Sequence, residues 1–280
     1  MRPYLGAHVS AAGGHYRAIE KAKELGANAI QIFGASPRQW KASIPSVEDV
    51  KKYKEALRKS DVKSVYLHAA YLVNLAGNID VYKKSVDNLS LHFQIACALG
   101  ADGLIFHIGT SRENGGEAIG RIARGIKEVL RKVKGPAKLV MENASGGGGK
   151  LGSSLEELVS LYQKVDSKRV GMCLDTAHAF EAGMLDLTPL GIKTFFNSWE
   201  KEIGMENLVA LHTNDSKTKF GSGSDRHENL GEGEIGIDGF RNLAKEKRLS
   251  HTSWILEVPG FDGMGPDKRN LDILKNCFVS

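Results

Sequence analysis

The chain has 280 residues, of which 41% are hydrophobic and 25% are charged, an ordinary composition for a globular protein. Its net charge of +5 is compatible with a polyanionic partner but does not require one. Three widely separated cysteines give no disulfide framework, and no apolar run is long enough for a membrane span or a signal peptide. We therefore expect a cytoplasmic protein that does not interact with membranes.

Short apolar runs alternate with longer helical patterns along the whole chain. The runs that we expect to be strands are residues 4–9, 29–33, 64–67, 103–106, 138–141, 170–174, 208–211 and 253–256. Helical patterns cover residues 18–25, 47–59, 79–99, 116–133, 238–247 and 268–276, and another helix begins after Ser153 and Ser154. Eight strand–helix units without a break in composition predict a single domain over residues 1–280, an α/β fold whose parallel sheet closes into a (β/α)₈ TIM barrel.

The third to the eighth of these expected strands each end in a side chain that can bind a metal ion. The six residues are His68, His107, Glu142, Asp175, His212 and Glu257. A barrel brings all of them to the C-terminal ends of its strands, where buried Asp, Glu and His side chains need partners. Imidazole and carboxylate ligands without thiolates are typical of catalytic zinc, manganese or iron sites. Six ligands exceed the needs of one open site, so we expect at least two ions.

Two readings are open for the residues that follow the sixth strand. Asp175 could cap a helix, with His178 as a hydrogen-bonded loop residue, or both could be metal ligands. Asp225 and His227 lie in the polar loop 217–229 and could be either solvated surface or, with His178, a third group of ligands. A cluster of metal ions at such spacing acts in phosphoryl chemistry.

Several motifs resemble those of endonuclease IV, a family of zinc-dependent apurinic/apyrimidinic endonucleases of DNA base-excision repair. They are GAHVSAAGG (6–14), HAAYLVNLA (68–76), MENASG (141–146), CLDTAHAF (173–180), HTNDSK (212–217), DRH (225–227) and LGEG (230–233). The resemblance extends over nearly the whole chain. It implies hydrolysis of the phosphodiester 5′ to an abasic site in duplex DNA by a metal-bound hydroxide, which leaves 3′-hydroxyl and 5′-deoxyribose phosphate ends.

The resemblance also implies three Zn²⁺ ions, with Mn²⁺ possible at one position, and no organic cofactor. The first ion would be held by His68, His107 and Glu142, the second by Glu142 as a bridge with Asp175, His212 and Glu257, and the third by His178, Asp225 and His227. On this assignment Asp175 and His178 serve different ions. We expect Glu142 and Glu257 to be catalytic and the enzyme to act as a monomer.

The DNA-contacting positions implied by the resemblance are Arg38, Tyr71 and Leu72. In the family, such side chains enter the minor groove, kink the duplex and replace the flipped abasic nucleotide, which has little stacking to lose. From the residues alone, Arg38 could equally be a solvated surface residue and Tyr71 with Leu72 a core pair.

Three positions depart from the common family motifs. Ile108 follows His107 where proline is common, Thr213 follows His212 where leucine is common, and Val258 follows Glu257 where threonine is common. None of these changes removes a ligand. The main alternative is a sugar isomerase or epimerase of the xylose-isomerase-like group, which needs one or two ions, and the third ligand group argues against it. A non-catalytic DNA-lesion-binding protein is a second alternative, which the retention of all nine ligands disfavours.

Overall fold

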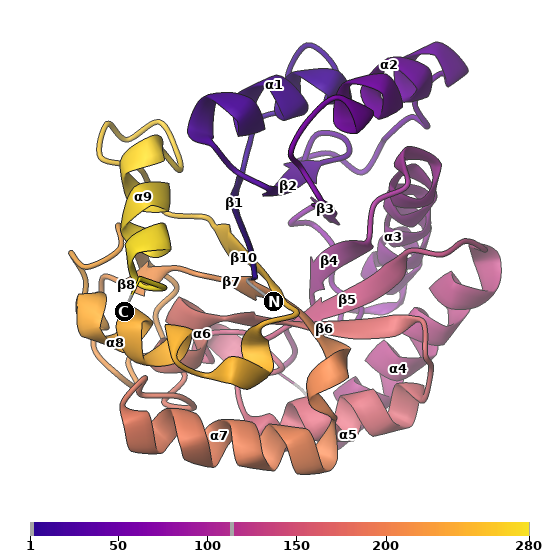
Figure 1. The fold of residues 1–280 in the computed structure, drawn as a ribbon. Coiled ribbons are helices and arrows are strands. Elements are labelled where there is room, and N and C mark those ends of the chain that lie inside the picture. The colour runs from indigo at the N-terminus through magenta and orange to yellow at the C-terminus, as the bar shows by residue number, and fades with distance from the viewer. Residues whose placement is uncertain (1–2, 113–114, 280) are drawn as a thin grey trace.

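Eight of the apolar runs form parallel strands that pair side by side and close into a barrel. In the computed structural model, which describes residues 3–112 and 115–279, the strand order around the barrel is β1-β2-β3-β4-β5-β6-β7-β10. The strands are β1 (Tyr4–His8), β2 (Ala29–Phe33), β3 (Ser64–His68), β4 (Gly103–His107), β5 (Lys138–Glu142), β6 (Val170–Asp175), β7 (Leu208–His212) and β10 (Ser253–Leu256). The predicted (β/α)₈ TIM barrel is confirmed (Figure 1).

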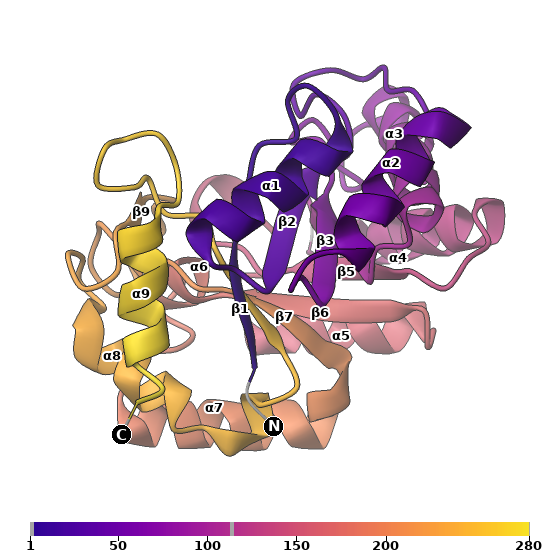
Figure 2. The ribbon, with the colours of Figure 1, turned by 45° about the horizontal axis from the view of Figure 1, so that its top comes forward.

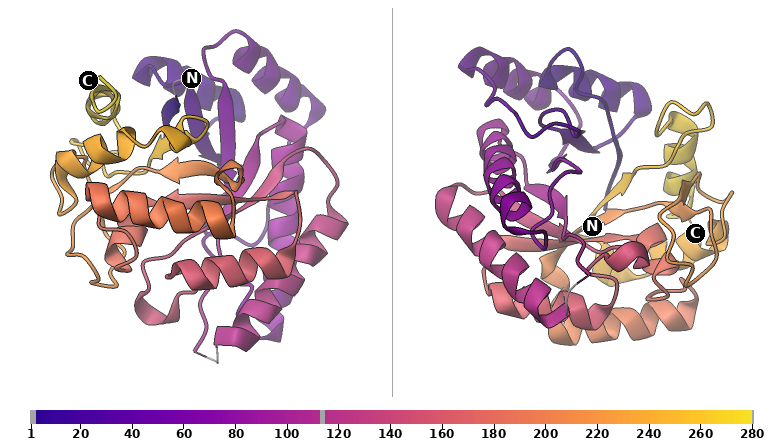
Figure 3. Two further views of the ribbon diagram at one scale, coloured as in Figure 1. Left: turned by 60° about the horizontal axis from the view of Figure 1, so that its bottom comes forward. Right: turned by 180° about the vertical axis from the view of Figure 1, so that it is seen from behind.

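Helices surround the strands, as Figures 1, 2 and 3 show from several sides. They are α1 (His15–Leu25), α2 (Val47–Arg58), α3 (Ile79–Leu99), α4 (Gly115–Lys132), α5 (Leu155–Val165), α7 (Pro189–Glu202), α8 (Gly236–Ala244) and α9 (Lys268–Asn276). Many begin at a side chain that accepts a hydrogen bond from the first turn, as Ser154 does from the N–H of Glu157. Their apolar faces pack on the outside of the barrel.

Successive strand residues face alternately toward the helices and toward the barrel axis. The buried residues that face the axis form a small cluster of their own, separate from the main core between strands and helices. It consists of Tyr66, Ile105, Val140, Cys173, Ala210 and Ile255. Because these side chains fill the barrel below the ligands, the interior is a packed core and the chemistry is confined to its C-terminal mouth.

Two parts of the fold, helix α7 and a short antiparallel strand pair, were not predicted, and a short helix capped by Asp175 was one of two interpretations left open. Helix α7 follows Thr188 and begins with Pro189, a capping threonine and a first-position proline, and it buries Phe196 and Trp199. The short helix α6 (Thr176–Glu181) and the antiparallel pair β8 (Asp215–Ser216) and β9 (His227–Glu228) carry too few residues to give a periodic pattern. Helix α8 also ends earlier than predicted, at Ala244, and a 3₁₀ turn follows at Lys247–Leu249.

No helix in the described ranges is both long and apolar enough to cross a membrane.

The connection between β10 and α9 forms a loop that projects beyond the neighbouring helices (Figure 2).

Candidate metal centre

Strand pairing brings the predicted ligands to one rim of the barrel. His107 at the end of β4 is paired with Glu142 at the end of β5, and Asp175 at the end of β6 with His212 at the end of β7. Glu257 directly follows β10. Each apolar run therefore stops where the next residue would leave the packed barrel interior, and the polar side chain that ends the run enters the mouth.

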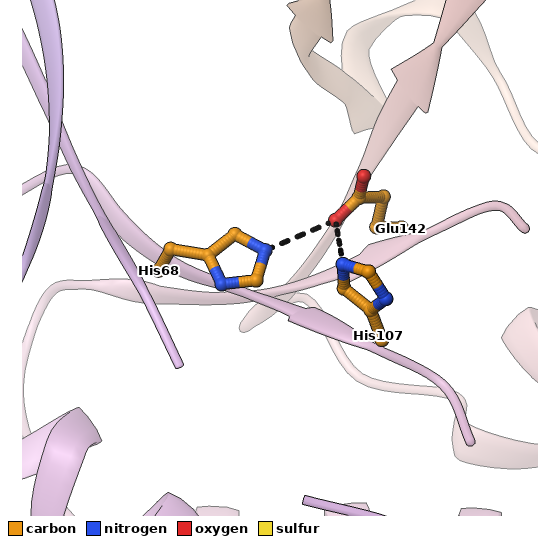
Figure 4. Close-up of side chains that lie close together, drawn as sticks. All are labelled: His68, His107 and Glu142. Atoms are coloured by element: carbon orange, nitrogen blue, oxygen red, sulfur yellow. Dashed lines mark hydrogen bonds and ion pairs between the residues drawn. The ribbon is translucent and has the colours of Figure 1, made fainter. Parts of the chain in front are cut away.

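The first group consists of His68, His107 and Glu142 (Figure 4). Glu142 Oε2 lies 3.2 Å from His68 Nε2 and 3.4 Å from His107 Nε2. Glu142 and His68 are buried, whereas His107 is partly exposed. Three donor atoms from three neighbouring strands thus converge on one point.

Glu142 also belongs to a second group, with Asp175, His212 and Glu257. Its other oxygen, Oε1, lies 2.9 Å from His212 Nδ1. The same nitrogen is 3.2 Å from Glu257 Oε2 and 3.8 Å from Asp175 Oδ2. Glu142 therefore directs one oxygen at each of two groups, which is the geometry that a bridging carboxylate needs.

The third group differs from the predicted set. Donor atoms of Asp175, His178 and His227 lie within 4.8 Å of one another, so Asp175 can reach two groups and shares one of them with His178. Asp225 lies directly beside this group, next to His178. Its Oδ1 lies 3.2 Å from His178 Nε2, and its Oδ2 accepts a hydrogen bond of 2.6 Å from Lys150. Asp175 and His178 thus share one donor group, although the predicted assignment gives them to different ions; Asp175 also belongs to the second group, as that assignment requires.

Asp175 combines the two roles that the sequence left open. Its Oδ1 accepts a hydrogen bond of 2.9 Å from the N–H of His178 and so caps helix α6. Its Oδ2 faces the donors, 3.5 Å from His227 Nε2, and accepts a hydrogen bond of 2.7 Å from Asn214. The helix cap fixes the carboxylate, and the second oxygen remains available for a ligand role.

Four of the histidines are oriented through one ring nitrogen, which lies beside a carbonyl or amide oxygen. The pairs are His68 Nδ1 with the Ala69 carbonyl at 2.8 Å, His178 Nδ1 with the Asn143 carbonyl at 3.1 Å, His212 Nε2 with Gln31 Oε1 at 2.8 Å, and His227 Nδ1 with the Glu257 carbonyl at 3.4 Å. Because each partner is an oxygen that can only accept, this nitrogen carries the proton. The other nitrogen of each ring then points at the donor groups, as in histidines that bind metal ions.

One buried nitrogen tests whether a metal ion fits this centre. His227 Nε2 is buried, and no hydrogen-bond partner for it exists among the described residues. Buried polar atoms without a partner are uncommon and need an explanation. A metal ion shared with Asp175 and His178 would supply the missing partner, so the donor set fits a metal centre.

Gln31 and His8 belong to the site but were not predicted. Gln31 is fully buried in β2 and contacts His212, Glu257 Oε1 at 2.5 Å and His8 Nδ1 at 2.9 Å. His8 ends β1 and lies 3.1 Å from Glu257 Oε1. A polar residue inside the apolar run 29–33 was the available signal for Gln31, since a buried amide requires hydrogen-bond partners.

Opposite charges shift the ionisation of the buried groups. Burial opposes ionisation of Glu142, but His212 and His107 hold its pKa well below that of an ordinary carboxyl group. Burial disfavours the protonated ring of His178, yet Asp175 and Asp225 raise its pKa to about 10. The hydrogen bond from His178 and the pairing with Lys150 keep the pKa of Asp225 far below its usual range. The centre therefore favours ionised carboxylates together with protonated His178 and His212, whereas burial lowers the pKa of His107 to about 4.

The centre opens into a cavity of about 810 Å³, whose wall includes Glu257, His227, Phe33 and Tyr71. The Tyr71 side chain is 58% exposed and its ring packs edge-on against Phe33. Of the three predicted DNA-contacting residues, Tyr71 alone lines this cavity, whereas Arg38 is exposed and Leu72 is half-buried.

Comparison with known proteins agrees with this geometry. Residues 19–277 match the family model described as the xylose isomerase-like TIM barrel. The chain is 37% identical to a probable endonuclease 4 of Halothermothrix orenii, across 97% of this chain and 99% of that one. It superposes on the crystal structure of endonuclease IV from Thermus thermophilus with a TM-score of 0.87, 33% identity and 99% coverage of both chains. The chain belongs to the endonuclease IV family.

The barrel of this endonuclease IV family member is also shared with sugar-converting enzymes. A D-tagatose 3-epimerase-like protein superposes with a TM-score of 0.71 at 21% identity. At that identity the likeness reports the fold alone, so the donor set and its surroundings must distinguish the two kinds of chemistry.

Replacing Gln31 with leucine should weaken metal binding without a large change in volume. The His212 ring would lose the acceptor that fixes its proton on Nε2, a loss that usually costs about 10- to 100-fold in metal affinity. Competition of the purified protein with a chromophoric chelator for Zn²⁺ measures this. Gln163→Leu, on the exposed face of α5, is the matched control and should bind Zn²⁺ as the wild type does. Equal affinities of the two variants would contradict the orienting role of Gln31.

Metal binding should release protons at neutral pH. The pKa of His178 is raised to about 10, and that of His212 is also raised, so both rings are protonated at pH 7.5 and an incoming ion must displace those protons. Zn²⁺ affinity should consequently increase from pH 6 to pH 8. Calorimetric titration with Zn²⁺ in buffers of different ionisation enthalpy measures the protons released, and heats independent of the buffer would refute the prediction.

Proposed function

We propose that this chain is an apurinic/apyrimidinic endonuclease that hydrolyses the phosphodiester 5′ to an abasic site in duplex DNA. The products are a 3′-hydroxyl and a 5′-deoxyribose phosphate. The observation that carries the proposal is the buried histidine–carboxylate centre, with four oriented rings, at the base of an open cavity. Membership of the endonuclease IV family supports it.

The donor groups would hold three Zn²⁺ ions, with Mn²⁺ possible at one position. We assign His68, His107 and Glu142 to the first ion, Glu142, Asp175, His212 and Glu257 to the second, and His178, Asp225 and His227 to the third. Bound there, the ions would lower the pKa of a water molecule and stabilise negative charge on the phosphate and on the leaving 3′ oxygen. The positions of the donor side chains determine where the ions would stabilise that negative charge.

Charge explains why the chain needs these ions to bind a phosphate. The centre contains four carboxylates, Glu142, Asp175, Asp225 and Glu257. By themselves they would repel a phosphodiester strongly at the low dielectric of a buried site. Glu142 supplies one oxygen to each of two groups and so fixes their separation, and Glu257, on the cavity wall, faces the position of a substrate. We propose that these two carboxylates are the catalytic residues.

Tyr71 is the residue that we propose for opening the duplex. It is an exposed aromatic ring on the wall of the cavity, backed by Phe33 and His68. A ring held in this way can stack in the space of a missing base, while unstacking of an abasic nucleotide costs little. Leu72 would extend the apolar wedge and the exposed Arg38 would contact the backbone. We propose that the enzyme acts as a monomer in the cytoplasm.

The rival function, conversion of a sugar, fits fewer of the observations. A sugar-converting enzyme would need only the first two donor groups, and the group of His178 and His227 would then have no role. The orphaned nitrogen of His227 belongs to that third group. The third group therefore favours phosphodiester hydrolysis.

Cleavage of a duplex with one abasic-site analogue is the direct test of the proposed function. Zn²⁺-loaded protein should cut the strand on the 5′ side of the analogue, and prior chelation should abolish cutting. Glu142→Gln should lower kcat by about 100-fold or more, because a neutral amide can no longer serve two metal groups.

Glu48→Gln is a matched control for that variant, since Glu48 lies on the exposed side of α2, belongs neither to the donor groups nor to the cavity wall, and forms an ion pair with Lys52. It should retain full activity. An intact damaged duplex under varied salt and pH would refute the endonuclease, and near-normal turnover of Glu142→Gln would refute the bridging role.

Tyr71→Ala should weaken binding of the damaged duplex by about 5- to 100-fold, because stacking of a base on an aromatic ring is worth about 1–3 kcal/mol. Fluorescence anisotropy of the Zn²⁺-loaded protein with a duplex whose linkage 5′ to the abasic-site analogue cannot be hydrolysed measures affinity without cleavage. Tyr71→Phe keeps the ring and should bind as the wild type does, as should Leu190→Ala, which removes an exposed apolar side chain from α7. If Tyr71→Ala binds normally, the wedge lies elsewhere.

A further inference from the structure

The chain between β8 and β9, residues 217–226, carries Asp225 at its end, and His227 follows directly in β9. We call this segment the 217–226 loop. Both residues reach the third donor group only if the loop returns to the barrel mouth at the correct place. Pairing of Ser216 with His227 joins its two ends, but this pairing covers only two residues in each strand.

Glu181, the last residue of α6, contacts both ends of the 217–226 loop. Its Oε1 accepts hydrogen bonds from Ser216 Oγ at 2.8 Å and Thr218 Oγ1 at 3.2 Å, where the loop begins. The same oxygen accepts a hydrogen bond of 3.2 Å from the N–H of Arg226, between Asp225 and His227. One carboxylate oxygen thus joins the start of the loop to its end.

The position of Glu181 in α6 relates it to the metal centre. Asp175, which caps the helix, His178 and Glu181 follow one another at intervals of three residues. Residues three apart are neighbours on the helix surface, so Glu181 lies next to His178. The side of α6 that presents His178 to the third group therefore also presents the Glu181 carboxylate. That carboxylate holds the backbone between Asp225 and His227.

The burial of Glu181 is difficult to explain by packing. The residue is 0% exposed, and its Oε2 has no hydrogen-bond partner in the part of the chain that the structure describes. Burial also raises the pKa of its carboxyl group. An apolar residue would fill the same space without this cost, so the acceptor itself is the useful feature.

We propose that Glu181 is a positioning residue that fixes both ends of the 217–226 loop, so that Asp225 and His227 meet His178. The inference rests on the proposed role of these three residues as metal ligands. Glu181 is not itself a ligand, since it acts through the hydroxyl and backbone groups of the loop.

Other contacts hold the middle of the loop. The N–H of Gly221 donates to the Phe180 carbonyl at 3.0 Å and that of Gly223 to the Glu181 carbonyl at 2.8 Å. Lys150 holds the Asp225 side chain. A variant of the Glu181 side chain keeps all three contacts, so it separates the effect of the carboxylate from theirs.

Limited trypsin digestion of the chelated protein tests the proposal without any activity measurement. The loop contains cleavage sites after Lys217, Lys219 and Arg226. Cleavage at these sites requires local opening, so Glu181→Ala should be cut there about tenfold faster than the wild type. Mass spectrometry identifies the fragments. In a parallel chelator competition, the most weakly held Zn²⁺ should lose about tenfold in affinity.

Glu181→Gln is the conservative variant, and it retains a carbonyl oxygen that can accept the same three hydrogen bonds. It should restore the slow cleavage and the Zn²⁺ affinity. Asp102→Ala is the matched control, because Asp102 Oδ2 likewise accepts from one hydroxyl, Ser64, and one backbone N–H, Val65, at the opposite end of the barrel. It should leave cleavage of the 217–226 loop unchanged.

Wild-type cleavage of folded Glu181→Ala at all three sites would overturn the proposal, as would a Glu181→Gln variant as impaired as Glu181→Ala. If Glu181→Ala does not fold, the double variant Ser216→Ala with Thr218→Val takes its place. It removes two donors and keeps the carboxylate, and unchanged loop cleavage in it would also overturn the proposal. Because digestion needs neither metal nor DNA, failure of the endonuclease hypothesis would leave this result intact and interpretable.

Discussion

The sharing of the buried Glu142 carboxylate between two donor groups is the interaction on which the rest of the site depends. One oxygen faces His68 and His107 and the other faces His212, so this side chain of β5 contacts residues of three other strands. An isolated buried carboxylate would be neutral, but surrounding imidazoles keep this one ionised. The other buried polar groups at the barrel mouth also need hydrogen-bond partners. Gln31 fixes one ring nitrogen of His212, and the Asn143 carbonyl fixes one of His178. Asn214 donates a hydrogen bond to Asp175 Oδ2.

Much of the fold could be predicted because each strand is an apolar run that ends at a polar residue. In a parallel barrel such runs are buried on both faces, so they read as continuous hydrophobic segments and their ends are sharp. The bounds of β2 and β10 agree with prediction for this reason, and those of helices α3 and α9 agree because their apolar residues recur at helical spacing. Elements that lack such a pattern were not predicted. Strands β8 and β9 have two residues each and pair across the 217–226 loop, so no local periodicity marks them.

The site was predictable to a lesser degree. Strand-end ligands follow from topology, but the partner of a side chain such as Lys150 depends on a contact across 75 positions of sequence. Asp175 shows the limit most clearly, since capping of α6 and service in the donor groups were treated as alternatives. A carboxylate has two oxygens, and the structure uses one for each purpose. The roles of Glu181 and Gln31 could not be predicted from the sequence either, because they depend on partners far away in the chain.

The register between β4 and β5, which pairs His107 with Glu142, limits how such a chain can diverge. Side chains alternate between the barrel axis and the helices, so one residue inserted or deleted within either strand would turn its ligand to the opposite face. Changes of length are harmless only where they fall outside the strands. Relatives of this protein can therefore lengthen or shorten the connections around the mouth, while the strands that end in ligands must keep a constant number of residues.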